Sequence, residues 1–141
     1  QNAITLDGLL ASIEGITPQR LDPRCTRNSH YAYIFHYDRR AFAGVSTQRF
    51  IEALVAEGIP NQASYPPLHA LDLFKSGAYR RRLAGDQAVE AHAFLHQDFP
   101  ASTAGAWETV WIPHAALLGA PEDLQEIAAA IRKIQIHAGR L

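Results

Sequence analysis

The pattern of apolar and polar positions along the chain predicts three amphipathic helices. Each segment repeats apolar residues at intervals of three and four, which places them on one face of a helix. The last segment also has Pro121 at its first position, where proline is favoured. The three apolar faces are Leu6, Leu9, Leu10 and Ile13 between a Thr5 cap and Gly15; Phe50, Ile51, Leu54 and Val55 between a Ser46 or Thr47 cap and Gly58; and Leu124, Ile127, Ala128, Ile131 and Ile134 after Pro121.

Two further segments have the pattern of β-strands. In His30–Tyr37 aromatic residues occupy every second position, and Thr109–His114 is a short apolar run. Residues 59–64 are predicted as a short extended segment. Residues 17–29 are polar and contain two prolines, so we predict an irregular connection there. The order of these elements predicts an α/β fold, in which helices pack on a small sheet of three or four strands.

The region between the two strand signals is predicted to be mainly helical. Ala70–Leu83 has a helical pattern that breaks at Ser76-Gly77, and Asp86 can cap a further helix towards His96. Phe99-Pro100 interrupts this pattern, and Ser102–Ala106 adds one more turn. We find no internal repeat and no composition shift, so the whole chain is predicted to be one domain.

The composition is that of an ordinary globular domain. The 141 residues are 48% hydrophobic and 19% charged, with a net charge of −1. This balance favours neither nucleic acid nor an anionic membrane as a partner, and the only basic run, Arg80–Arg82, lacks interleaved aromatic residues. No apolar run is long enough to span a membrane. Cys25 is the single cysteine, which fits a cytoplasmic location.

The residues that usually carry catalysis are sparse. His92 and His96 lie four residues apart on one predicted helix face, but no third ligand follows at zinc-site spacing, so we predict no metal. Cys25 has no base assigned to it by the sequence, and there is no nucleophile elbow or phosphate-binding glycine loop. Lys75, which follows an apolar helical segment, and Lys133, near the end of the last helix, are the only lysines, and neither is predicted to be desolvated enough to serve as a catalytic amine. The chain alone therefore does not have the pattern of a complete enzyme.

The segment Tyr65-Pro66-Pro67-Leu68-His69 is a stiff turn that carries two polar rings. Two prolines fix two φ angles and favour extended geometry at Tyr65. Such a turn holds a phenol and an imidazole in a set relation at low entropic cost. The alternative interpretation is a rigid loop whose rings only pack.

Five segments follow one another in a fixed order: Phe50–Ile59, Tyr65–His69, Glu108–His114, Leu117–Gly119 and Glu122–Ile131. In this order and spacing they resemble the C-terminal domain of the DegT/StrS-type sugar aminotransferases, which are fold-type I enzymes dependent on pyridoxal phosphate. The aromatic strand that ends in Pro-His is similar to members acting on cyclic ketones, such as scyllo-inosose aminotransferase and aminohydroxybenzoate synthase. The chain departs from the pattern at Ser64, where many members have a histidine.

The resemblance implies that residues 1–141 are the small domain of a larger protein, a two-layer α+β sandwich with a mostly antiparallel sheet. It implies a cytoplasmic homodimer that transfers an amino group from an amino acid, often glutamate or glutamine, to a keto-sugar or keto-cyclitol, with pyridoxal phosphate as electron sink. The cofactor-binding residues would lie in a large domain absent from this chain, so the chain alone is expected to bind no cofactor and to be inactive. The candidates for the substrate cleft are Tyr65, His69, His114, Trp111 and His30.

Two other functions stay open from the sequence. The chain contains no methionine and begins with Gln1, which favours a piece of a longer protein over a free-standing one. A stand-alone binding or regulatory module with the same fold is the main alternative. An unrelated enzyme that uses Cys25 or a histidine metal site is disfavoured, because neither has the partners that its chemistry needs.

Overall fold

The computed structural model describes residues 1–75 and 98–141. These residues belong to two compact units, which we describe separately. The sheet unit comprises residues 1–64 and 108–141, and the inserted unit comprises residues 65–107. The assignment of the whole chain to one domain stays a prediction.

Within the described residues, the sheet unit contains a four-stranded antiparallel sheet in the order β1-β2-β4-β3. Its strands are β1 (Ile16–Pro18), β2 (Ala32–Tyr37), β3 (Gln62–Ala63) and β4 (Thr109–Pro113). Residues on β2 and β4 alternate between buried and half-buried, because helices cover one face of the sheet. The predicted α/β fold with a small antiparallel sheet is therefore confirmed, and both main strand predictions hold to within two residues.

The strand β1 contradicts the prediction that residues 17–29 are irregular from their start. Ile16 pairs with Tyr37, and Pro18 pairs with Phe35. The proline at position 18 misled the prediction, since proline cannot donate to a central strand. At the sheet edge it is tolerated, because no further strand needs its missing N–H group.

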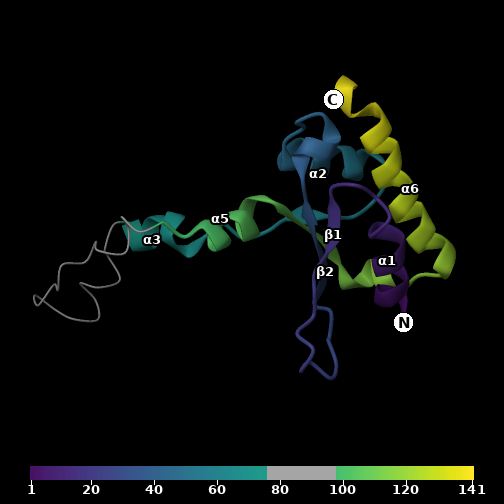
Figure 1. Ribbon diagram of the computed structural model, residues 1–141, viewed down its shortest axis with the longest axis horizontal. Helices are drawn as coiled ribbons and strands as arrows, with labels where there is room; N and C mark the ends of the chain where they lie inside the picture. The colour runs from purple at the N-terminus through teal and green to yellow at the C-terminus, as the bar shows by residue number, and fades with distance from the viewer. Residues whose placement is uncertain (76–97) are drawn as a thin grey trace, which may run out of the picture. The chain divides into compact units, whose positions relative to one another are not determined.

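Three helices of the sheet unit were predicted, and all three are present: α1 (Asn2–Leu10), α2 (Thr47–Ala56) and α6 (Pro121–His137). In Figure 1, α1 lies beside α6, and α6 also packs against α2. Ser46 caps α2 by accepting a hydrogen bond from the Arg49 amide, and Gly58 adopts the left-handed conformation just after this helix, as predicted. No helix among the described residues is long and apolar enough to cross a membrane.

Three details of these helices differ from the prediction. The first is that α1 ends at Leu10, so Ile13 and Gly15 lie beyond the helix rather than in its last turn. Thr5 lies inside α1 rather than at its start, because the Asn2 side chain donates to the carbonyl groups of Leu117 and Gly119 and anchors an earlier beginning. Val55 is 58% exposed, although it follows the apolar residue Leu54. Neighbouring residues on a helix point in different directions, so Leu54 faces the core while Val55 lies beyond the edge of the buried face.

The core of the sheet unit is centred on an aromatic cluster. Phe50 of α2 stacks on Tyr37 at a ring distance of 4.3 Å and meets the edges of Phe35 and Phe42. Phe42 belongs to the 3₁₀-helix η1 (Arg39–Phe42), which the sequence analysis treated as a plain turn region. The predicted apolar face of α6 is buried against the same core.

The inserted unit contains the described elements η2 (Leu68–Ala70), α3 (Asp72–Lys75) and α5 (Pro100–Trp107). The single turn predicted at 102–106 is a longer helix, because Pro100 begins α5 rather than interrupting a helix. Several predictions lie outside the described residues: the break at Ser76-Gly77, the run Arg80–Arg82, the helix from Asp86, and the pair His92 and His96.

Candidate functional site

The turn of the inserted unit carries the first two candidate residues. Tyr65 is 67% exposed, and Pro67 has extended geometry (φ −62°, ψ 140°) immediately before η2. His69 lies in η2, half-buried, and its ring packs on that of Phe99 at 5.1 Å with an angle of 31° between the ring planes. The turn therefore presents an exposed phenol, while a tertiary contact holds the imidazole.

Phe99 is a site residue that the sequence analysis missed. It was interpreted only as part of a helix interruption. Its partner His69 lies thirty positions earlier along the chain, and no local pattern predicts a contact over that distance. An apolar ring beside a proline is a weak signal, because such rings occur in many loops.

The other candidates lie in the sheet unit. His114 is exposed and begins the 3₁₀-helix η4 (His114–Leu118), directly after β4. Since Ala32 pairs with Pro113, His30 and His114 fall at the same end of the central strand pair. Trp111 is half-buried in β4, opposite Ile34 and Gln62.

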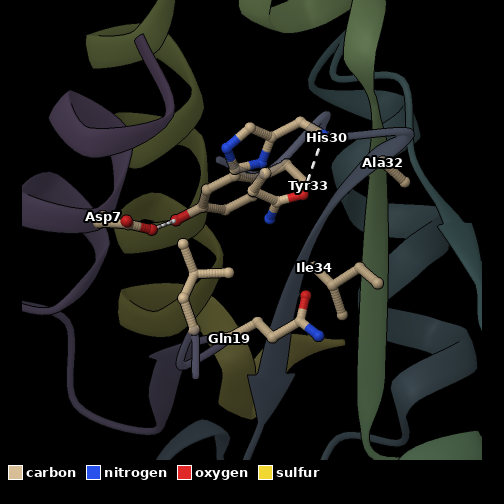
Figure 2. A pocket seen from close by; sticks show the side chains of 8 residues that line it. Asp7, Gln19, His30, Ala32, Tyr33 and Ile34 are labelled. Atoms are coloured by element: carbon tan, nitrogen blue, oxygen red, sulfur yellow. Dashed lines mark hydrogen bonds between the residues drawn. The ribbon is translucent and has the colours of Figure 1, made fainter. Parts of the chain in front are cut away.

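His30 lines a small hollow between α1 and the start of β2, as Figure 2 shows. The cavity volume is about 20 Å³. The backbone of His30 is left-handed (φ 48°), and its N–H group donates to Asn28 Oδ1 at 3.0 Å. The other lining residues are Asp7, Gln19, Leu21, Asn28, Ala32, Tyr33 and Ile34. Sequence analysis found His30 but none of the polar partners that the fold brings to it.

A short hydrogen bond forms one wall of this hollow. The Tyr33 hydroxyl donates to Asp7 Oδ1 at 2.6 Å. The pKa of Tyr33 is raised, first by burial of the phenol and then by its hydrogen bond to the Asp7 carboxylate and the negative charge of that group. Tyr33 therefore stays protonated at neutral pH and acts as the donor to Asp7.

The described part of the chain gives no support to catalysis by Cys25 or by a histidine metal site. Cys25 is exposed, and its Sγ atom lies 3.4 Å from the carbonyl oxygen of Arg27. Among residues 1–75 and 98–141, no three His, Cys, Asp or Glu side chains gather as a metal site. His36 and Glu108 form an ion pair at 2.9 Å that sequence analysis missed, but both side chains are exposed and such pairs contribute little to stability.

Comparison with known proteins identifies this fold. No family model matches the chain. A provisionally named L-glutamine:3-amino-2,3-dideoxy-scyllo-inosose aminotransferase from Streptomyces kanamyceticus is 35% identical over 138 residues, which cover 95% of this chain and 33% of that protein. The L-glutamine:2-deoxy-scyllo-inosose aminotransferase of Streptoalloteichus tenebrarius is 33% identical over 142 residues, covering 100% of this chain and 33% of that protein.

A solved structure gives the same result. The crystal structure of 3-amino-5-hydroxybenzoic acid synthase superposes with a TM-score of 0.70 at 29% identity, over 94% of this chain and 32% of that one. The fold of this chain is thus shared with about a third of that enzyme. The resemblance to the DegT/StrS-type sugar aminotransferases that the sequence pattern predicted is confirmed, and the chain spans about a third of the length of the curated relatives that it matches.

Proposed function

We propose that this chain is the C-terminal small domain of an aminotransferase that moves an amino group from L-glutamine to a keto-cyclitol. The observation that carries the proposal is the match to glutamine:scyllo-inosose aminotransferases over nearly the whole chain. The intact protein would be a cytoplasmic homodimer, and the catalytic domain would lie outside this chain. The domain shapes the substrate cleft and is inactive alone.

The cofactor of the intact protein would be pyridoxal phosphate, which supplies an electron sink for amino transfer. The residues of this chain do not fit that group. A lysine that binds the cofactor covalently needs a desolvated amine. Lys133 instead forms an ion pair with Glu57 at 2.7 Å on the surface, and Lys75 is exposed at the end of α3. We therefore assign the cofactor site to the remainder of the protein.

Within this proposal, Tyr65 and His69 face the substrate. A cyclitol presents many hydroxyl groups, and a phenol and an imidazole can each donate or accept a hydrogen bond to one of them. The prolines of the turn and the ring of Phe99 restrict the motion of both groups before the substrate binds. His114 and His30, at one end of the central strand pair, are further candidates for the cleft.

Replacing Tyr65 by phenylalanine, or His69 by alanine, should lower kcat/KM for a keto-cyclitol by about tenfold each, because each change removes one hydrogen bond to the substrate. The assay uses a chain that also carries the cofactor-binding part. Leu68→Ala is the matched control, since Leu68 lies in the same turn and is 66% exposed. Wild-type kinetics in both variants would contradict the assignment of this turn to the cleft.

The function itself is tested by two measurements. An immunoblot against this domain gives the mass of the native protein in its source cell. A mass several-fold above 15.6 kDa, together with glutamine-dependent amination of 2-deoxy-scyllo-inosose, supports the aminotransferase. A native mass near 15.6 kDa would instead indicate a free-standing binding module and would refute the proposal.

A further inference from the structure

Among residues 1–75 and 98–141, no Lys or Arg side chain pairs with the carboxylate of Asp7. It is half-buried between α1 and β2, and among the described residues its side chain accepts one hydrogen bond, from the neutral Tyr33 hydroxyl. The five ion pairs of the described residues all use other carboxylates. The guanidinium of Arg24 is bound to Asp22. A partly buried carboxylate is stabilised by a cation, and no described residue supplies one.

Other polar groups around the same hollow also have unused hydrogen-bonding capacity. The side-chain amide of Gln19 and the ring of His30 make no hydrogen bond with the described residues, and both line the hollow with Asp7, as Figure 2 shows. Asn28 uses its Oδ1 atom to hold the His30 backbone, which leaves its NH₂ group available. The hollow thus combines one carboxylate with two side-chain amides and an imidazole.

The size of the hollow limits what enters it. A cavity needs roughly 10–15 Å³ to hold one water molecule. The volume here is about 20 Å³, so one group of the size of water fits, and a whole sugar ring does not. Leu21 and Ile34 add apolar atoms to the lining of the hollow. A primary ammonium group matches both the size and the charge.

We propose that the hollow between Asp7, Gln19, His30 and Tyr33 binds the primary ammonium group of a polyhydroxylated ring. The ammonium donates to the free oxygen of Asp7, while Gln19 and His30 bond to hydroxyl groups on the adjoining ring carbons, which stay outside the hollow. The same hollow discriminates against a ring that carries a hydroxyl in place of the amine, because a neutral hydroxyl does not compensate the Asp7 charge.

The choice of a cyclitol as the ring rests on the proposed function. The relatives include proteins named for 2-deoxy-scyllo-inosose and three provisionally named for a 3-amino-2,3-dideoxy-scyllo-inosose. An ammonium site would favour the already aminated ring. The preference for an ammonium group, in contrast, rests on Asp7 and its surroundings and does not depend on turnover.

The test is a pair of binding titrations on the 141-residue protein, followed by NMR chemical shifts. The probes are scyllo-inosamine, which has one amine, and scyllo-inositol, which has a hydroxyl at that position. We expect the amine to bind at least about tenfold more tightly, because a charged hydrogen bond contributes more than a neutral one. The shifts should centre on Asp7, His30 and Tyr33. Equal binding of the two rings would overturn the proposal.

Three variants locate the effect. Asp7→Asn keeps an acceptor for Tyr33 and removes the charge, so the preference should disappear. Glu14→Gln removes one negative charge from an exposed position outside the hollow and should leave the preference unchanged. Gln19→Glu adds a carboxylate at an exposed lining position and should increase the preference, which provides a second test if Asp7→Asn unfolds. A preference that survives Asp7→Asn, or that Glu14→Gln also lowers, would refute the site.

The two proposals can fail independently. If the intact protein does not aminate a keto-cyclitol but the amine preference is present, the ammonium site stands and the proposed reaction falls. If amination occurs but the two probes bind equally, the reaction stands and the ammonium site falls.

Discussion

Replacing Phe50 by alanine should lower the free energy of unfolding by about 3–5 kcal/mol. The side chain is fully buried, and its ring contacts those of Tyr37, Phe35 and Phe42. The substitution removes a whole aromatic ring from the centre of this cluster and leaves a cavity that the rigid sheet cannot close. Urea denaturation of the 141-residue protein measures the change.

The control for this prediction lies on the same helix. Val55→Ala, at a position 58% exposed, should change the free energy of unfolding by less than about 0.5 kcal/mol. Phe50→Leu should have an intermediate effect, since it retains most of the apolar volume. A loss below about 1 kcal/mol for Phe50→Ala would show that the aromatic cluster is not the centre of the core.

Replacing Gly15 by alanine should cost about 2–4 kcal/mol, since backbone strain and a steric clash add together. Gly15 has φ +80°, which side chains with a Cβ atom rarely adopt. A Cβ atom at this position would overlap that of Ala41 and approach the carbonyl oxygen of Asp38 to 3.0 Å. Thermal and urea denaturation measure the loss.

Gly58 separates the two causes. It has nearly the same conformation (φ +84°), but nothing lies within 4 Å of a Cβ atom built there. Gly58→Ala should therefore cost only the backbone strain, about 1–2 kcal/mol. Adding Ala41→Gly to Gly15→Ala should recover part of the loss. If the Gly15 and Gly58 variants lose equal stability, the predicted clash is wrong.

The two candidate regions form in different ways, one mainly from local sequence and the other from tertiary contacts. The backbone of the turn at Tyr65–His69 is stiff because of its own prolines, which is a local property, whereas the His69 ring is held by its contact with Phe99. The hollow at His30 depends on three segments that are distant in sequence: α1 supplies Asp7, β2 supplies Tyr33, and the connection between β1 and β2 supplies Gln19 and His30. Only folding of the sheet unit creates the second site.

The sequence analysis did not identify the hydrogen bond between Tyr33 and Asp7, because Tyr33 was interpreted only as a strand residue. Tyr33 was interpreted as one of four alternating aromatic residues, and its ring is indeed buried in the sheet. A buried phenol still needs a hydrogen-bond partner for its hydroxyl group. The sequence does not indicate that Asp7, on a helix twenty-six positions earlier, is that partner.

The sequence by itself determined the three amphipathic helices, the two main strands, the Ser46 cap, the left-handed stop at Gly58 and the family, because each depends on local periodicity or on an ordered set of motifs. The tertiary structure alone decided the edge strand β1, the contact between His69 and Phe99, and the hollow around Asp7. These features join residues far apart in the chain. Their stability comes from burial and hydrogen bonding that exist only once the sheet and helices have packed together.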